Sequence, residues 1–356
     1  MELLAAYPAA RIVAPKVHAH FTRQRSETSP DSAELLAALP DIPTIQALVD
    51  AAFWASLRKE EGFVPRITLA FLPPSATQTA LFFERPLPLD PGVLTRVAPA
   101  VERPGIHLGV WRTPDAIQVW GATRKIPSLC LVVEVAAPGV IVIKHHSRDT
   151  AGKYVNVAVL EGDQVKMIDP SVSPFSGKHS GDVLVRLAVS MRAHGRGGLL
   201  LLVPASGNWR ESIVSPIPYA VSPPFSGLAE LARTADSESL RLAKTIDAVG
   251  GLTAVDGAMI LTDEYEVLAF GAKITRRKGH PLVEQVLLSE PIEGGEPVLV
   301  QLDKLGGTRH LSAAQFVHDQ QNAIAMVASQ DGRFTVFEWS IRDSMVHAHR
   351  IEALLL

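Results

Sequence analysis

Residues 197–203 read Gly-Gly-Leu-Leu-Leu-Leu-Val and form a continuous apolar run that a proline ends. A run of this length between glycine and proline is typical of a strand that is buried on both faces. Further strand-like runs cover residues 254–261, 266–270, 323–327 and 333–339. Segments with apolar residues at helical spacing separate these runs. We therefore expect the second half of the chain to form a mixed β-sheet that is flanked by helices.

The helices expected around this sheet follow from the spacing of apolar residues and from flanking turn residues. Four segments have this pattern: 181–193, 226–249 with a break near Asp236, 282–289 and 312–319. Residues 297–300 predict a short strand, and the Pro-rich stretch 215–224 is interpreted as a connector.

The first half of the chain has a different rhythm. Apolar residues at helical spacing within the first 60 residues predict helices over 32–39 and 44–57. From residue 66 onward the chain breaks into short apolar runs, most of them parted by Gly, Pro or Asp. This half is therefore expected to be an α+β domain with a largely antiparallel sheet, running from residue 67 to 168.

A polar stretch at residues 169–177 separates the two rhythms. It reads Asp-Pro-Ser-Val-Ser-Pro-Phe-Ser-Gly, a composition typical of a linker. We place the domain boundary near residue 175, which predicts an N-terminal domain over 1–175 and a C-terminal domain over 176–356.

Length and composition restrict the class of protein. The chain has 356 residues and is 47% hydrophobic, which is ample for two cores. The formal net charge of −3 gives no general electrostatic case for nucleic acid or a membrane surface. Cys130 is the single cysteine, so an internal disulfide is excluded, and its apolar neighbours predict a buried, inert thiol. The start of the sequence lacks signal-peptide features, and no apolar run reaches the roughly 20 residues of a membrane span. We expect a soluble, cytoplasmic protein.

The tripeptide Asp256-Gly257-Ala258 is the first segment with chemical potential. Asp-Gly is in itself a turn signature, because both residues tolerate a positive φ. Here apolar residues follow directly, so the carboxylate is expected at the start of a strand, and the small Ala258 allows close approach of a ligand. A carboxylate at such a position can hold a phosphate-bound divalent cation or orient an attacking hydroxyl group.

The pentapeptide at 306–310, Gly-Gly-Thr-Arg-His, precedes a predicted helix. Successive backbone N–H groups and the start of a helix together favour an anion. Thr308 adds a hydroxyl donor, Arg309 a bidentate guanidinium and His310 a further donor for phosphate oxygens. The plain alternative is a glycine turn with a surface arginine. The segment is not a Walker loop, because the Lys-Ser/Thr ending is missing.

Other candidates are open to plainer interpretations. The turn His194–Gly198 could bind phosphate, but a helix end and a tight turn explain it as well. The basic loop 273–280 is either solvated or in contact with a triphosphate or a second subunit. The pair His145-His146 suggests a metal only weakly, since no cysteine or ordered carboxylate stands nearby at ligand spacing, and His347 and His349 are given a similarly weak metal interpretation.

The segments of the second half, taken in their order along the chain, resemble the diadenylate cyclase (DAC) domain, which joins two ATP molecules into cyclic di-AMP. The resemblance covers somewhat under half of the chain. It rests on the strand at 197–203, Asp256-Gly257-Ala258, the strand Phe270–Ile274, Gly307-Thr308-Arg309-His310 with Ala313 and Ala314 after it, and the turn Ala328-Ser329-Gln330-Asp331-Gly332. The first half of the chain resembles, more loosely, the sensor-type domains that precede some soluble DAC domains.

The resemblance implies a cyclase that works as a face-to-face pair of C-terminal domains, each holding one ATP. The 3′-hydroxyl of one ATP attacks the α-phosphorus of the other, pyrophosphate leaves, and a Mg²⁺ or Mn²⁺ ion assists. The implied site has catalytic residues Asp256, Arg309 and His310, nucleotide contacts from Gly257, Ala258, Gly307, Thr308, Arg309, His310 and Ser329, and metal ligands Asp256 and Asp331. The N-terminal domain is expected to receive an unidentified small-molecule or protein signal; no nucleic acid or membrane partner is expected.

Two positions depart from the family pattern. Leu311 stands where a second arginine is common, and Gln330 stands where an acidic residue is common. Lys273, Arg276 or Arg277 could replace the lost positive charge, and Asp331 the lost carboxylate. The departures keep an alternative open: a nucleotide-binding regulator that has the fold but little or no turnover.

Overall fold

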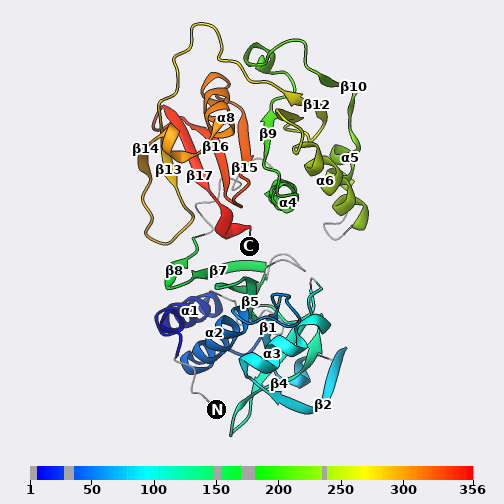
Figure 1. Ribbon diagram of the computed structural model, residues 1–356, viewed down its shortest axis with the longest axis vertical. Coiled ribbons are helices and arrows are strands. Elements are labelled where there is room, and N and C mark those ends of the chain that lie inside the picture. Colours follow the sequence, from blue (N-terminus) through cyan, green and yellow to red (C-terminus); the bar gives the residue numbers. More distant parts are fainter. Residues whose placement is uncertain are drawn as a thin grey trace. The chain divides into compact units, whose positions relative to one another are not determined.

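The computed structural model describes residues 6–27, 36–77, 79–103, 105–147, 154–169, 181–234 and 239–355. The chain divides into two compact units, Met1–Ile168 and Asp169–Leu355 (Figure 1). The boundary that the sequence predicts near residue 175 lies outside the described residues. No helix in the described ranges is long and apolar enough to cross a membrane.

The N-terminal unit contains an eight-stranded sheet in the order β2-β4-β3-β1-β5-β6-β7-β8. β1 and β3 run parallel, and the other neighbours are antiparallel, as the sequence predicts. The strands are β1 (Thr68–Phe71), β2 (Ala80–Pro88), β3 (His107–Arg112), β4 (Ile117–Thr123), β5 (Leu131–Ala137), β6 (Val140–His146), β7 (Tyr154–Glu161) and β8 (Gln164–Met167).

The described residues of this unit form three α-helices, α1 (Pro8–Ser26), α2 (Ile42–Ser56) and α3 (Pro91–Val97). The Asp41 side chain caps α2 by accepting a hydrogen bond from the Thr44 amide at 2.9 Å. α1 and α2 pack on each other and on strands β5 to β8, where their apolar faces enter one core. The helix predicted over 32–39 is wrong from Leu36 onward, because Leu36 forms a β-bridge with Ser128; residues 32–35 lie outside the described ranges.

The C-terminal unit contains a nine-stranded mixed sheet in the order β10-β12-β11-β9-β15-β16-β17-β13-β14. β9 pairs in parallel with β11, and β13 with β17; the other neighbours are antiparallel. The strands are β9 (Gly198–Val203), β10 (Tyr219–Phe225), β11 (Ala258–Thr262), β12 (Val267–Ala272), β13 (Gln285–Ser289), β14 (Val298–Gln301), β15 (Ile324–Ala328), β16 (Phe334–Ser340) and β17 (Met345–Arg350).

Burial on both faces explains why β9 is continuously apolar. Leu200 and Leu202 face a core that is closed by α4 (Gly181–Ala193), α5 (Gly227–Thr234) and α6 (Leu240–Leu252). Leu199 and Leu201 face the opposite core, which α7 (Leu302–Leu305) and α8 (Thr308–Asp319) close. The mixed sheet with helices on both faces, expected from this run, is therefore confirmed.

Three elements of this unit differ from the predictions. Residues 282–289 were predicted as a helix, but Gln285–Ser289 form β13, held by register pairing with β14 and β17. The connector 215–224 contains most of β10, which pairs with β12. α8 begins at Thr308, four residues before the predicted start, so Thr308, Arg309 and His310 lie in its first turn.

Candidate functional site

A cavity of about 590 Å³ lies where β11 and α8 begin, beside the end of β12 and the turn after β15. All of the predicted site residues except Asp331 line it. The lining consists of Leu199, Asp256, Gly257, Ala258, Ala272, Lys273, Ile274, Gly307, Thr308, Arg309, His310, Ser312, Val327, Ala328, Ser329 and Gln330. Segments that lie about fifty residues apart in sequence thus meet around one space.

Gly257 fixes the start of β11 because no other residue fits there. Its φ is +120°, and a Cβ at this position would lie 2.5 Å from the backbone carbon of Gly271. Asp256 therefore projects beside the end of β12, where its Oδ2 accepts a hydrogen bond from Lys273 Nζ at 2.7 Å. The hydrogen bond and charge of Lys273 lower the pKa of Asp256, with a smaller contribution from Arg309. The carboxylate, 89% exposed, is thus an open anion at the cavity.

His310 lies in the first turn of α8 and lines the cavity from the interior of the unit. His310 is buried, and its ring lies so close to Gly306 that a Cβ there would be 2.3 Å from its Nδ1. Its Nε2 lies 3.5 Å from Thr335 Oγ1 on β16. Burial lowers the pKa of His310, and the nearby charge of Asp331 opposes that shift. His310 is therefore neutral at pH 7 and can act as a hydrogen-bond donor or acceptor.

Arg309 lies over the turn that leads into β9. Gly197 has a φ of +70°, and a Cβ there would lie 2.7 Å from Arg309 Nη1. Gln330 Nε2 donates to the carbonyl oxygen of Arg196 at 3.4 Å. The same turn is therefore also hydrogen-bonded to a residue that lines the cavity from the turn after β15. Gly197 thus leaves room for the Arg309 guanidinium, and this reason depends on tertiary contacts that the local pattern does not encode.

Ser329 and Gln330 line the cavity from the turn after β15, whereas Asp331 does not. The Asp331 carboxylate instead accepts from the Arg333 amide at 3.3 Å and lies 3.4 Å from Arg333 Nε. The structure thus places one of the two predicted metal ligands, Asp256, at the cavity. Leu311, 41% exposed, also lies outside the lining, while Gln330, the other departure from the family pattern, belongs to it.

The remaining histidine candidates lie elsewhere. His145 is buried on β6 beside Phe21, and burial lowers its pKa. The rings of His347 and His349 stack at 4.1 Å, and His349 contacts Ser289 Oγ and Glu338 Oε1 at 2.9 Å each. None of them belongs to the one group of three metal-ligating side chains found in the described ranges, which consists of His280, His318 and Asp319.

The sequence pointed to Lys273 as part of the basic loop 273–280 and as a substitute charge, and it did not assign Ser312 or Ile274 to the site. Both belong to segments that the sequence identified, but their place at the cavity depends on the β12–β11 pairing and on where α8 begins. The sequence does contain a signal for the early start of α8, because Gly307 precedes a run that reaches Asp319 without a further glycine or proline.

The donors at the cavity suit a hard divalent cation that is shared with a triphosphate. Mg²⁺ typically takes one or two protein carboxylates and completes its shell with phosphate oxygens and water. Asp256 offers an exposed carboxylate, and the hydroxyls of Thr308 and Ser329 line the same space. The residues therefore fit Mg²⁺ or Mn²⁺, with Asp256 as the protein carboxylate that would hold it.

Comparison with known proteins gives three findings. Residues 34–124 match the family model described as "Probable sensor domain DACNV", which bears out the expected sensor-type domain in the N-terminal half. No curated protein matches the chain. Among solved structures, a double mutant of DacA from Staphylococcus aureus is similar, with 16% sequence identity, 47% of this chain and 83% of that chain covered, and a TM-score of 0.25.

Proposed function

We propose that the chain is a diadenylate cyclase whose C-terminal unit converts two ATP molecules into cyclic di-AMP and pyrophosphate. The observation that carries the proposal is the single cavity that joins the Asp256 carboxylate, the first turn of α8 and the Ser329 turn. A helix start favours the phosphates, and a separate open carboxylate suits their cation. The sequence resemblance described above supplies the reaction.

The residues have distinct roles in this proposal. The N–H groups at the start of α8 and the Arg309 guanidinium bind the triphosphate, and the Arg309 charge stabilises the charge that develops at the α-phosphoryl group. His310, neutral and held against Gly306, donates a hydrogen bond to a phosphate oxygen. A bound Mg²⁺ or Mn²⁺ would supply charge neutralisation of the phosphate oxygens. Asp256 would hold this ion and orient the attacking 3′-hydroxyl.

The chemistry requires two copies of the unit. One cavity holds one ATP, while each bond-forming step joins the 3′-oxygen of one ATP to the α-phosphorus of another. The bond from the α-phosphorus to the pyrophosphate oxygen breaks, pyrophosphate leaves, and the hydroxyl proton passes to solvent. Catalysis is then largely positioning, which two facing cavities provide. We infer a homo-oligomer for this reason.

The N-terminal unit is proposed to regulate this reaction. Its segment 34–124 matches a sensor-domain family, and it forms a compact unit with its own core. A signal that favours one arrangement of paired C-terminal units would change the rate through differential interaction of a few kcal/mol. The signal is a small molecule or a protein.

A direct assay tests the proposed function. Purified full-length protein is incubated with ATP and Mg²⁺ or Mn²⁺, and the products are separated by chromatography. Formation of cyclic di-AMP and pyrophosphate in a ratio of about one to two is expected from the stoichiometry of the two steps.

A specific observation favours a second candidate, a nucleotide-binding regulator without turnover. Gln330 lines the cavity where the family commonly has an acid, and Lys273 occupies one oxygen of Asp256. This alternative predicts that ATP binds in calorimetry while no product forms under any metal condition. ATP that neither binds nor reacts would contradict both functions.

A further inference from the structure

A second polar cavity, of about 370 Å³, lies in the C-terminal unit at the other end of α8. Its walls include Asn208, His280, His318 and Asp319. The candidate site lies at the first turn of α8, and eleven residues of helical rise separate the two ends by about 16 Å. The second cavity is therefore a separate place in the molecule, and the proposed cyclase chemistry uses none of its side chains.

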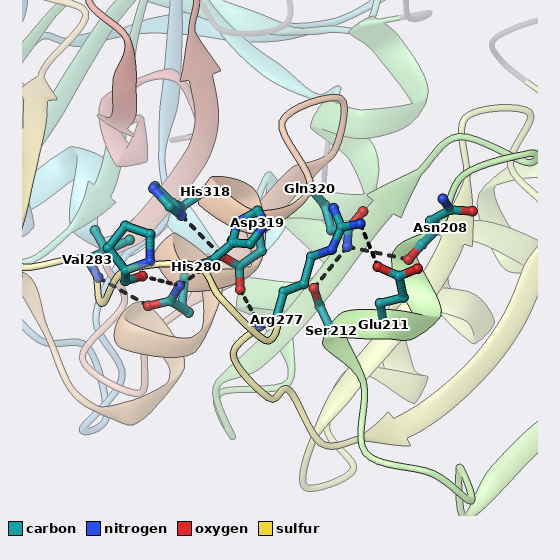
Figure 2. Close-up of polar contacts among 11 residues, drawn as sticks. Asn208, Glu211, Ser212, Arg277, His280, Val283, His318, Asp319 and Gln320 are labelled. Atoms are coloured by element: carbon teal, nitrogen blue, oxygen red, sulfur yellow. Dashed lines mark hydrogen bonds and ion pairs between the residues drawn. The ribbon is translucent and has the colours of Figure 1, made fainter.

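His280, His318 and Asp319, which we call the His-His-Asp cluster, converge at this cavity from two elements. Figure 2 shows His318 and Asp319 at the end of α8 and His280 on the segment before β13, around the Asp319 carboxylate. Asp319 Oδ1 lies 3.0 Å from His318 Nδ1 and 3.2 Å from His280 Nδ1. One ligand atom from each residue can be chosen so that all lie within 4.8 Å of one another.

The Asp319 carboxylate needs a positive partner. Its side chain is fully buried, and burying an ionised carboxylate is costly unless a positive charge or a metal ion and hydrogen bonds compensate it. Arg277 contacts Asp319 through its backbone amide at 2.7 Å, but its guanidinium binds Glu211 at 2.6 Å (Figure 2). The ion pairs of Asp319 within the described ranges are with His280 and His318, which are neutral unless protonated.

Three nitrogen atoms also crowd one oxygen. Gln315 Nε2 donates to Asp319 Oδ1 at 3.0 Å, in addition to the two histidine contacts. A carboxylate oxygen has about two lone-pair sites, so three donors cannot all be well directed toward it. A bound cation would accept the Nδ1 lone pairs of both histidines, whose ring protons would then lie on Nε2. The two histidines would no longer donate to Asp319 Oδ1, and the cation would supply the positive charge that the carboxylate lacks.

We propose that the His-His-Asp cluster binds a transition-metal ion of the Zn²⁺ class, with a fourth position open to water from the cavity. Two imidazoles, one carboxylate and a water form a regular tetrahedral zinc site. With metal–ligand distances of about 2.0–2.1 Å, tetrahedral ligand atoms lie about 3.3 Å apart, close to the two Asp319–histidine distances. Binding requires the remaining separation, between the ligand nitrogens of His280 and His318, to shorten toward this value.

The hydrogen bonds behind the cluster suit a metal site. Ligating carboxylates in such sites are held by further hydrogen bonds, which orient them toward the ion. Asp319 is held by the amide of Arg277 and by Gln315, and Gln315 in turn accepts from Val283 N and donates to Pro281 O at 3.1 Å each. The ion would thus tie the segment 277–283 to α8, the helix whose first turn carries Arg309.

Metal titration of the full-length, untagged protein tests the proposal without reference to cyclase activity. The protein is stripped with a chelator, dialysed, and titrated with Zn²⁺ by calorimetry in excess Mg²⁺ and without nucleotide. One Zn²⁺ per chain is expected, and Co²⁺ in its place should give the visible absorption of a four-coordinate ion. His280→Ala should weaken binding at least about 100-fold, because even the loss of a residue that supports a ligand costs 10- to 100-fold.

Matched variants separate this site from others. His347→Ala removes a histidine of the same unit and should retain wild-type Zn²⁺ affinity, as should Asp256→Asn at the candidate site. His280→Cys, which keeps a zinc ligand, should restore most of the affinity. Circular dichroism verifies the fold of each variant, and His318→Gln replaces His280→Ala if the latter is unfolded. The proposal is overturned if the wild type takes up no Zn²⁺ below millimolar concentration, or if the cluster variants bind it as the wild type does.

Discussion

At the scale of single residues, the ion pair between Asp256 and Lys273 is the feature that most affects the proposed chemistry. The carboxylate is exposed and its pKa is lowered, so it is ionised at any pH at which the protein would act. Lys273 binds one carboxylate oxygen, Oδ2, of this side chain, which also lines the cavity. A cation that binds the Asp256 carboxylate would therefore share it with Lys273, and would not merely displace water from it.

Asp256→Asn should abolish cyclic di-AMP formation while the fold is retained. Asparagine is nearly isosteric, suits the turn and can still accept a hydrogen bond from Lys273, but it lacks the charge that a divalent cation requires. Product is measured by chromatography, with Asp303→Asn on the exposed face of α7 as the control. Product formation by the Asp256 variant at the parent rate would exclude a catalytic role for this carboxylate.

Arg309→Ala should weaken ATP binding by about 10- to 100-fold, because a hydrogen bond to a charged group contributes roughly 1.5–3 kcal/mol. The affinity is measured by calorimetry, and Arg342→Ala, an exposed arginine outside the cavity, serves as the control. Equal affinities in the two variants would mean that the Arg309 guanidinium does not contact phosphate.

At the scale of elements, the close contact between the Gly306 backbone and the His310 ring positions the start of α8. Gly306→Ala would place a Cβ 2.3 Å from His310 Nδ1, so either the ring or the helix start must shift. We expect ATP affinity to fall at least about tenfold, which corresponds to roughly 1.4 kcal/mol. Gly251→Ala at the end of α6, where a Cβ meets open space, is the matched control. A Gly306 variant with wild-type affinity and fold would show that this contact does not set the site.

The sheet of the N-terminal unit contains histidines whose burial predicts a pH dependence. His107 on β3 contacts the Tyr154 hydroxyl on β7 at 2.7 Å, and burial is the main cause that lowers its pKa to about 4. The unfolded chain, with a histidine pKa near 6.5, binds more protons than the folded one between these values, so stability falls as pH falls.

The expected loss from His107 is about 2 kcal/mol between pH 7 and pH 5. Urea unfolding of the full-length protein at both pH values, followed by fluorescence, measures it for the N-terminal transition. In His107→Gln the difference between the two pH values should shrink by that amount. An unchanged pH difference would mean that His107 titrates alike in the folded and unfolded chain.

At the scale of the whole molecule, the two compact units have separate cores, one formed by helices α1 and α2 on the first sheet and the other on both faces of β9. A fragment that starts near Ser176 should therefore be soluble and bind ATP, with an altered rate or altered self-association. Circular dichroism, calorimetry and sedimentation measure these properties against the full-length protein. A fragment that is insoluble or unfolded would show that the units depend on one another to fold.

The local sequence pattern predicted an element correctly where only one structure could explain the residues present. The run at 197–203 predicted a strand buried on both faces, because only such a strand excludes polar residues from both of its sides. The division of the first half into short strands from residue 66 onward followed from apolar runs that turn residues separate. Local pattern failed at 282–289, where the spacing of apolar residues resembles a helix but pairing with β14 and β17 makes Gln285–Ser289 a strand.

The sequence alone determined which segments of this protein carry chemical groups: Asp256-Gly257-Ala258, Gly307–His310 and the Ser329 turn. It could do so because glycine and charge at the ends of apolar runs are local signals. Only the tertiary structure decided that these segments share a cavity, that Asp331 stays outside it, that Lys273 reaches Asp256 and that His280 joins His318 and Asp319. The reason is that strand order and register set these distances, and both depend on contacts between residues far apart in the chain, which local periodicity does not encode.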